Sequence, residues 1–520
     1  MIEIYDTTLR DGTQRTDVSL SCSDKLAIAH HLDDLGVAYI EGGWPGSNPK
    51  DVEFFQRAAQ ETWHTAQITS FGATCQANKE PADDANIQAL LESGTKICVI
   101  FGKTSVLHVT EILRTTRENN LRMIEQSVAY LLSQGRRVFY DAEHFFDGYK
   151  LDPGYALDTL GAAVRGGAEI VVLCDTNGGI MPWEVSEIVQ QVKGRLNTPL
   201  GIHAHNDGEC AVANTLAAVR EGCVQVQGTI NGYGERCGNA NLCSVLPDLE
   251  LKLGLKGLPD GRLEKLFEIS HYVSEMANLA QDEHLAYVGR AAFAHKGGIH
   301  VSAIHRNIHS YQHIDPALVG NQLQVVVSEL SGKSNLLHKI KEYGLESDEQ
   351  LDVSGILQEV KALEAQGFSF EAADASVVMM LKRHQKNYKP PFELIDFNVM
   401  VEHRQGRGIF SEATVKVCIK NEIHHTAADG NGPVAALDTA LRKALVSQYP
   451  QIAKFHLFDY KVRILDTDKG TSATTRVLIE TRNGNHSWNT VGASSNIIEA
   501  SWRALADSVE FGLLQVSPTR

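Results

Sequence analysis

The first 255 residues repeat one unit, in which a short β-branched run is followed by a polar loop and an amphipathic helix. The runs expected to form strands are residues 2–9, 37–43, 66–72, 95–102, 136–143, 168–175, 199–205 and 224–231. Several of the helices between them end at glycine, as a left-handed C-cap requires. Eight such units predict an α/β fold, a closed (β/α)8 TIM barrel, because eight is the number that closes it. An open doubly wound sheet is the alternative arrangement of the same elements.

The remainder of the chain differs in pattern. Helical stretches with irregular loops predominate in residues 256–388 and predict a helical accessory region. Two consecutive prolines in KNYKPPF then mark a boundary near residue 390. The tail, residues 389–520, contains an internal repeat, with segments of strand, turn, strand, glycine-bearing loop and helix that begin at Ala413 and Ala473. It predicts a C-terminal α+β domain that forms a dimer or binds a ligand, or that serves only as an oligomerisation module.

The charge balance narrows the class of partner. The 48 Lys and Arg residues against 64 Asp and Glu residues give a formal net charge of −16. An acidic surface argues against nucleic acid and anionic membrane as partners. No apolar run approaches the roughly 20 residues that span a bilayer, and the N-terminus does not have the pattern of a signal peptide. Nine scattered cysteines fit a reducing compartment, so we expect a cytoplasmic protein.

Polar residues collect where the predicted strands end, the rim at which TIM barrels place their active sites. His203 and His205 are two residues apart on the seventh strand, so both side chains point to the same side. Asp11 follows the first strand and completes a set of two histidines and one carboxylate with open positions, which suits Mn, Zn, Co or Mg. Asn239 falls on the same rim. One core and one surface histidine is the alternative, and it does not explain this convergence.

Three further rim residues carry candidate chemistry. Arg10 lies beside Asp11, where its guanidinium could polarise a carbonyl oxygen or neutralise an alkoxide; a salt bridge within the barrel is an additional role. Glu143 ends the fifth strand in an aromatic, polar loop and is a candidate acid or base. Thr176 could orient a substrate carboxylate or could be an ordinary loop hydroxyl.

Three barrel motifs together carry a resemblance to a known family. DTTLRDG, HAHND and GYGERCGN match the TIM-barrel metallolyases that have an Arg-Asp pair on strand 1 and an HxH on strand 7. Within that family the chain resembles the branch of 2-isopropylmalate, homocitrate and citramalate synthases. AAFAHKGGIH and ELSGKSNL resemble the accessory region of that branch, and DGNGPVAALDTAL resembles its regulatory domain. The resemblance therefore covers nearly the whole chain.

The resemblance implies roles by position. The implied metal ligands are Asp11, His203, His205 and Asn239. Arg10 would contact the 2-oxo group, Thr176 would lie near the substrate carboxylate, and Glu143 would be catalytic. His300 of GGIH would reach the active site of the partner subunit, and Tyr311 would assist the base.

The implied reaction condenses acetyl-CoA, the co-substrate, with a 2-oxo acid in a homodimer that an amino acid regulates. Bulky aromatics in EGGWP and in AEHFFDGYK, with Phe145 and Phe146, depart from the isopropylmalate type. We expect them to shrink the pocket to the size of pyruvate, with isoleucine as the effector. Acceptance of 2-oxoisovalerate or 2-oxoglutarate, a retro-aldol lyase of the same metal family and a non-catalytic amino-acid sensor are the competing hypotheses.

Overall fold

The structure is a computed structural model that describes residues 1–345, 351–406, 408–484 and 486–516. The chain divides into two units. The first comprises Met1–Phe293 and Ile314–Gln322, and the second contains Ala294–His313 and the described residues from Leu323 onward. The domain borders predicted near residues 255 and 388 follow changes in sequence pattern and stay a prediction.

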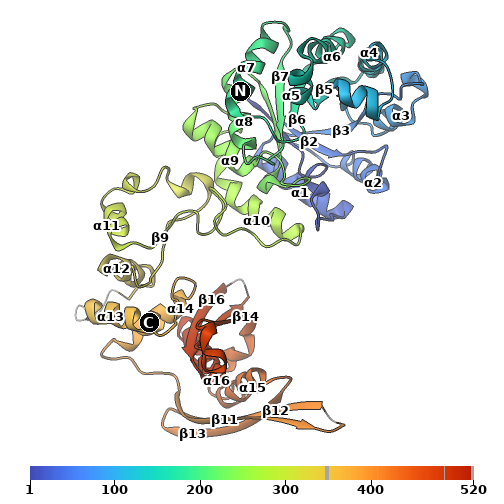
Figure 1. The fold of residues 1–520 in the computed structure, drawn as a ribbon. Helices are drawn as coiled ribbons and strands as arrows, with labels where there is room; N and C mark the ends of the chain where they lie inside the picture. The colour runs from blue at the N-terminus through green and yellow to red at the C-terminus, as the bar shows by residue number, and fades with distance from the viewer. Residues whose placement is uncertain (346–350, 407, 485, 517–520) are drawn as a thin grey trace. The chain divides into compact units, whose positions relative to one another are not determined.

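Eight parallel strands close into a barrel in the first unit, which confirms the predicted fold class (Figure 1). The strands are β1 (Glu3–Asp6), β2 (Tyr39–Gly43), β3 (Gln67–Ala73), β4 (Ile97–Lys103), β5 (Arg137–Glu143), β6 (Ile170–Asp175), β7 (Leu200–Ala204) and β8 (Gln225–Gly228). The first strand pairs with both β2 and β8, and Glu3 lies opposite Gln225. This pairing excludes the open sheet.

Helices surround the barrel. They are α1 (Cys22–Leu35), α2 (Pro49–Ala58), α3 (Ala85–Glu92), α4 (Arg117–Ser133), α5 (Phe145–Leu151), α6 (Pro153–Gly166), α7 (Pro182–Lys193), α8 (Ala211–Arg220), α9 (Leu242–Pro247) and α10 (Leu266–Met276). Gly36 follows α1 with φ of 95°, the predicted left-handed cap. None of the helices in the described part of the chain has both the length and the apolar character needed to cross a lipid bilayer.

Successive side chains along each barrel strand point alternately into two hydrophobic cores. Side chains that point outward, such as Ile4, Ile100 and Ile202, pack with the surrounding helices. Side chains that point inward, such as Tyr5 and Phe139, fill the barrel interior. Residues two apart on a strand therefore face the same core, and polar residues that continue the inward series at the strand ends emerge at the rim.

The second unit begins with helices and a short two-stranded sheet. Its first elements are β9 (Ala294–His295), α11 (Gly298–Arg306), β10 (Gln324–Val325), α12 (Lys333–Glu342), α13 (Val353–Ala365) and α14 (Asp374–Arg383). The tail adds β11 (Glu393–Arg404), β12 (Gly408–Ile419), β13 (Glu422–Gly430), α15 (Pro433–Leu445), β14 (His456–Ile464), β15 (Thr475–Asn483), β16 (His486–Ser494) and α16 (Ile497–Val516).

The tail confirms the internal repeat and enlarges it. Each half is a three-stranded antiparallel sheet followed by a helix, because β11 and β14 precede the segments recognised in the sequence. Both added strands carry an irregularity at the same place, between Leu394 and Asp396 and between Leu457 and Asp459. That irregularity interrupts the alternation of apolar and polar residues by which a strand is recognised.

The outer face of the second sheet, the face turned away from α16, is covered by the accessory segment. Val491 and Ala493 of β16 pack with Phe368 and Phe370, which precede α14. Arg476 of β15 donates through Nε to the carbonyl of Gly367 at 2.5 Å. The second half of the tail and the accessory helices therefore share one core.

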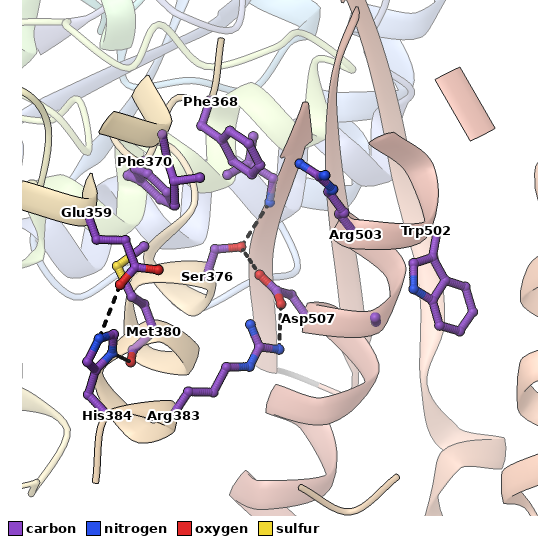
Figure 2. A pocket seen from close by; sticks show the side chains of 13 residues that line it. Glu359, Phe368, Phe370, Ser376, Met380, Arg383, His384, Trp502, Arg503 and Asp507 are labelled. Carbon is purple, nitrogen blue, oxygen red and sulfur yellow. Dashed lines mark hydrogen bonds and ion pairs between the residues drawn. The ribbon is translucent and has the colours of Figure 1, made fainter. Parts of the chain in front are cut away.

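Polar side chains join α14 and the turn after it to α16, and we call this set the α14–α16 joint. Figure 2 shows Ser376 donating to Oδ2 of Asp507, at 2.8 Å, and Arg383 donating to Oδ1 of Asp507, at 2.7 Å. Glu510 accepts from Arg383 and from the hydroxyl of Tyr388. A cavity of about 320 Å³ adjoins the joint. Its charged groups are paired with one another, so the joint has the character of a structural contact.

Candidate active site

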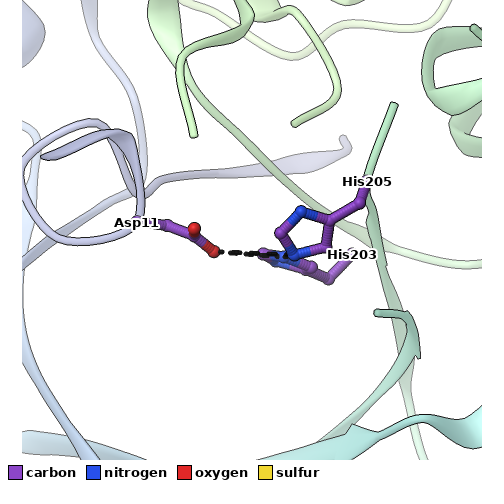
Figure 3. Close-up of side chains that lie close together, drawn as sticks. All are labelled: Asp11, His203 and His205. Carbon is purple, nitrogen blue, oxygen red and sulfur yellow. Dashed lines mark hydrogen bonds and ion pairs between the residues drawn. The ribbon is translucent and has the colours of Figure 1, made fainter. Parts of the chain in front are cut away.

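The two histidines of the HxH motif turn their rings toward Asp11, as Figure 3 shows. Nε2 of His203 lies 3.3 Å from Nε2 of His205 and 3.4 Å from Oδ2 of Asp11. Nε2 of His205 lies 4.0 Å from the same carboxylate oxygen. Among the described residues, no other trio of histidine, cysteine, aspartate or glutamate brings its ligand atoms together in this way.

The protonation of this trio suits a cation. Nδ1 of His203 lies 2.9 Å from Oε1 of Gln227, a pure acceptor, so Nδ1 carries the proton and Nε2 faces the site. Burial, then the charge on His203, lowers the pKa of His205 to about 4 and leaves that imidazole neutral. Burial opposes ionisation of Asp11, but Arg10 and His203 outweigh it and lower the pKa of its carboxyl.

The proton on His203 and several buried polar atoms without hydrogen-bond partners also bear on whether a cation binds here. Burial lowers the pKa of His203, yet its contact with Asp11 outweighs this and raises it, so a bound cation would replace a proton here. Oδ1 of Asp11, Nδ1 of His205 and Oδ1 of Asn239 are buried without a hydrogen-bond partner. Buried polar atoms are normally satisfied. Unsatisfied oxygens on Asp11 and Asn239, beside the Nε2 atoms of the two histidines, fit an ion with its bound waters.

Asn239 is held beside the trio by its backbone. It forms an isolated bridge with His205, and its Nδ2 donates to the carbonyl of Tyr233 at 3.1 Å. That bond fixes the amide and leaves Oδ1 as the atom without a partner. The position agrees with a ligand or near-ligand role, which stays a prediction.

Arg10 is fixed from three directions. Its Nε donates to Glu41 at 2.7 Å, and its Nη1 lies 3.3 Å from Asp11. Its guanidinium carbon lies 3.7 Å from the centroid of the Phe71 ring, and the hydroxyl of Tyr5 holds Glu41 in turn at 2.8 Å. The salt bridge anticipated from the sequence is present, and it holds the guanidinium next to the histidine pair.

The trio and Arg10 line a cavity of about 170 Å³. Three aromatic rings form one wall: Trp44 lies 5.8 Å from Phe71 and 5.5 Å from Phe101, between ring centroids. Phe71 and Phe101 stack at 5.4 Å. Nε1 of Trp44 donates to Asn86 at 2.7 Å, which fixes the indole. A rigid apolar wall thus limits the space beside Arg10.

The prediction that Phe145 and Phe146 narrow the pocket was wrong. The two side chains are 0% and 1% exposed and belong to the core between the barrel and its helices. The backbone of His144 adopts φ of 58°, and α5 begins at the next residue. This turn sends both rings away from the rim. Trp44 of EGGWP does line the cavity, as expected.

Glu143 lines the same cavity and forms an ion pair with Nζ of Lys103, which ends β4. Its carbonyl accepts from the backbone and the hydroxyl of Thr104, so the loop around it is fixed. The ammonium of Lys103 compensates the charge of a carboxylate that is mostly shielded from water. Glu143 is therefore placed at the rim as a base candidate.

Thr176 also lines the cavity, but its hydroxyl has a structural contact. Oγ1 accepts from the backbone N–H of His144 at 2.8 Å, and its carbonyl accepts from Arg236 at 2.7 Å. The loop-hydroxyl interpretation accounts for these bonds. Contact with a substrate carboxylate stays a prediction.

His300 and Tyr311 belong to the second unit and are not part of the barrel group. Their rings stack with centroids 4.1 Å apart and planes inclined by 25°. Tyr311 is 47% exposed. The two residues form one aromatic and titratable pair, and their action in a partner's active site stays a prediction.

Sequence reasoning missed several residues of the site. Lys103 directly follows a predicted strand, and Phe71 and Phe101 each lie one residue before a predicted strand end. Their positions bring them near the rim without showing whether their side chains face the cavity. Gln227 continues the inward series of β8 in the run VQVQG, where a glutamine among valines is an available signal. The pairing of Lys103 with Glu143 required knowledge of which strands are neighbours.

Three family models match the chain in order. Residues 1–273 match the model described as HMGL-like, and residues 287–367 match the homocitrate synthase post-HMGL domain-like model. Residues 371–513 match the LeuA allosteric (dimerisation) domain. These matches cover the barrel, the accessory region and the tail.

Curated relatives match over the full length. The (R)-citramalate synthase of Geobacter sulfurreducens is 52% identical, covering 99% of this chain and 98% of the relative. The (R)-citramalate synthase of Aquifex aeolicus is 50% identical over 99% and 98%. A 2-isopropylmalate synthase of Methanocaldococcus jannaschii is 31% identical over 98% and 94%.

Proposed function

The chain belongs to the HMGL-like family, among full-length (R)-citramalate synthases, and from this membership we propose that it condenses acetyl-CoA with pyruvate and water to give (R)-citramalate and CoA. One observation carries the proposal within the site. A converging Asp11, His203 and His205 trio lies beside Arg10 in a small cavity with an aromatic wall. Residues able to hold a cation, an arginine able to polarise a carbonyl group and an aromatic wall that limits acceptor size therefore surround one cavity.

The trio would hold a divalent ion, with Asn239 beside it. When bound, such an ion supplies Lewis-acid activation of a 2-oxo group. Arg10 keeps a full positive charge next to the same point, because Glu41 and Asp11 pair with it. Its guanidinium stabilises the oxyanion that develops as the new carbon–carbon bond forms.

The proton step needs a base near the methyl group of acetyl-CoA. Of the predicted group of Glu143, His300 and Tyr311, the barrel rim supplies Glu143. Its carboxylate takes the methyl proton, and the carbanion attacks the keto carbon of pyruvate. Lys103 holds the carboxylate in place. Water then hydrolyses the thioester and releases CoA.

Acceptor size favours pyruvate over 2-oxoisovalerate. Trp44, Phe71 and Phe101 contact one another and leave about 170 Å³ in the cavity that also holds Arg10. Forcing extra methyl groups against a packed wall costs about 1–3 kcal/mol. We expect a selectivity of about ten- to a hundredfold from this wall.

Release of CoA from acetyl-CoA, measured in parallel with pyruvate, 2-oxobutyrate, 2-oxoisovalerate and 2-oxoglutarate, tests the reaction and the acceptor together. We expect the highest kcat/KM with pyruvate, and chiral analysis should find (R)-citramalate. A preference for 2-oxoisovalerate would overturn the acceptor assignment. No CoA release with any of the four would overturn the condensation.

We further propose a homodimer and an isoleucine effector bound in the tail, supported by the match to an allosteric dimerisation domain. Calorimetric titration of the full chain with isoleucine, and with leucine as the comparison, tests the effector. A His203→Ala chain is the matched control, because an effector site separate from the rim should bind isoleucine unchanged. Truncation near residue 390 is a poor test, since it would uncover Phe368 and Phe370.

A further inference from the structure

The shape of the rim cavity depends on where the ring of Trp44 lies, and Trp44 follows an irregular strand end. The pairing of β2 with β3 shifts its register between Glu41 and Gly43. Gly43 adopts φ of 151°, and a Cβ there would overlap the carboxyl group of Asp51, so glycine is required. Irregularities of this kind redirect the side chains that follow. Here the redirected side chain is Trp44, which reaches the cavity wall.

The backbone of Trp44 is anchored to α1 and α2. Its N–H donates to Oδ2 of Asp51 at 2.8 Å, and Oδ1 of Asp51 pairs with the ammonium of Lys25. Nζ of Lys25 also donates to the carbonyl of Gly42 at 3.2 Å. Asp51 and Lys25 are both buried. This anchor fixes the point at which the side chain of Trp44 leaves the backbone, but it does not fix the rotation of the ring.

Asn86, at the start of α3, fixes that rotation. Nε1 of Trp44 donates to Oδ1 of Asn86 at 2.7 Å, and Nδ2 of Asn86 donates to the carbonyl of Ala73 at 2.7 Å. If the amide were turned over, its N–H groups would face the indole N–H, so both bonds require one orientation. Asn86 therefore ties the indole to the end of β3.

The backbone near Asn86 leaves its amide little space to move. A Cβ at Gly46 would lie 3.1 Å from Oδ1 of Asn86 and 3.3 Å from Nε1 of Trp44. A Cβ at Gly72 would lie 2.9 Å from the same oxygen of Asn86. Bare backbone thus packs closely against the hydrogen bond at two points. A hydrogen bond in such a low-dielectric setting is stronger than one in water.

The aromatic neighbours hold the ring of Trp44 less specifically. Phe71 and Phe101 meet it edge to face, with interplanar angles of 84° and 83°. Apolar contacts of this kind are less directional than a hydrogen bond. They keep the indole in the wall, whereas the bond to Asn86 selects its orientation.

We infer that Asn86 is a positioning residue that sets the acceptor size limit by holding the ring of Trp44. Asn86 itself is not among the residues that line the cavity. The inference rests on the proposed function, because it needs a reaction that distinguishes pyruvate from larger 2-oxo acids. A packed wall rejects an extra methyl group only as far as the wall does not yield. Without the bond to Asn86, the indole can tilt and the cavity admits a longer acceptor.

Acceptor selectivity of Asn86→Ala tests this role in the full chain. CoA release is measured with pyruvate and with 2-oxobutyrate, which is one methylene longer. We expect kcat/KM for 2-oxobutyrate to rise by about fivefold and kcat/KM for pyruvate to stay within about twofold. A general loss of packing would instead lower both values.

Two further variants accompany Asn86→Ala. Asn86→Ser keeps a hydroxyl at the start of α3 that is too short to reach the indole, so it should show the same change and replaces Asn86→Ala if that chain does not fold. Asn119→Ala is the matched control, because it removes a similar bond from α4 to the carbonyl of Ala77, at 3.0 Å. It should change neither kcat/KM value.

A double-mutant cycle tests whether Asn86 acts through the indole. Trp44→Phe removes the N–H that Asn86 accepts, so adding Asn86→Ala in that background should change the selectivity by less than about twofold. Nuclear magnetic resonance gives a readout without turnover. The indole N–H signal of Trp44, identified among the five tryptophans by its loss in Trp44→Phe, should shift in both Asn86 variants.

The outcomes separate the inference from the proposed function. Unchanged selectivity in the Asn86 variants of an active chain, or a fall in both kcat/KM values, overturns the inference and leaves the proposed reaction standing. An equal change of selectivity in the Trp44→Phe background overturns the route through the indole. A wild-type chain that releases no CoA with either acceptor overturns the proposed function, and the inference falls with it.

Discussion

Two regions of this chain bring several charged side chains together around buried carboxylates, and they differ in whether the polar atoms there have hydrogen-bond partners. At the α14–α16 joint, Asp507 accepts from Ser376 and Arg383, and Glu510 accepts from Arg383 and Tyr388. At the barrel rim, Asp11, His205 and Asn239 each keep a buried polar atom without a hydrogen-bond partner. The carboxylates of the joint find their hydrogen-bond partners within the chain, whereas these three atoms at the rim do not.

This difference distinguishes a contact that stabilises the fold from a site that binds a ligand. Leaving a buried donor or acceptor without a hydrogen-bond partner costs about 1–3 kcal/mol of stability. A cluster of such atoms is therefore expected where a bound ligand or ion supplies the missing partners. Burial is present in both regions and does not distinguish them. It raises the pKa of Asp507 at the joint, and at the rim Arg10 and His203 outweigh it and lower the pKa of Asp11. Substitutions should therefore affect ligand content and turnover at the rim, and stability at the joint.

The largest expected effect is the loss of both metal and turnover on removing a rim ligand. His203→Ala deletes one of three converging donor atoms, and we expect kcat/KM to fall by at least about 1000-fold, with bound metal lost. Elemental analysis and CoA release measure the two together. His425→Ala, an exposed tail histidine, is the control. Full activity in a metal-depleted His203→Ala chain would remove the metal role.

Arg10→Lys should separate turnover from metal binding. Lysine keeps the charge but not the planar fork that pairs with Glu41 and Asp11. We expect kcat to fall by about 100-fold, with metal content within about twofold. Arg15→Lys, at an exposed arginine, should change kcat little. Loss of the metal in parallel with kcat would make Arg10 a support of the metal site only.

Asp507→Ala should destabilise the chain without changing the rim. It removes partners from Ser376 and Arg383, and we expect about 2 kcal/mol less free energy of unfolding in denaturant titration. Metal content should stay unchanged. Asp468→Ala, at an exposed carboxylate, should cost less than about 0.5 kcal/mol. A stable Asp507→Ala chain would contradict the structural role of the joint.

The smallest expected effect comes from the same joint. Tyr388→Phe removes one hydroxyl that Glu510 accepts, while Arg383 still pairs with that carboxylate. We expect a loss of about 1 kcal/mol in the free energy of unfolding. The same titration measures it, with Tyr130→Phe on the barrel as comparison. An effect larger than that of Asp507→Ala would reverse the ranking within the joint.

Most of the barrel and the convergence of Asp11, His203 and His205 could be predicted from the sequence. Strand periodicity locates the strand ends, and parallel strands in a barrel end on one rim, so Asp11 and His203 could be placed together across 192 positions. The presence of Arg10 beside Asp11 follows from adjacency. The salt bridge to Glu41 follows because β1 and β2 are neighbours.

The features that could not be predicted depend on which way side chains point and on how neighbouring strands are aligned. Phe145 and Phe146 were misplaced because one left-handed residue, His144, redirects the chain before α5. Phe71 and Phe101 were missed because strand periodicity does not say which of two alternating sets faces inward. The strands β11 and β14 escaped recognition because an irregularity breaks the alternation in each.

Metal titration of a chelator-treated chain tests the central claim most directly. Manganese, zinc, cobalt or magnesium is added back in steps, and formation of (R)-citramalate from acetyl-CoA and pyruvate is followed. We predict activity that rises in proportion to bound ion and saturates at one ion per chain, because the described chain holds one converging trio. Full activity in the chelated chain, with no response to added ion, would contradict the account.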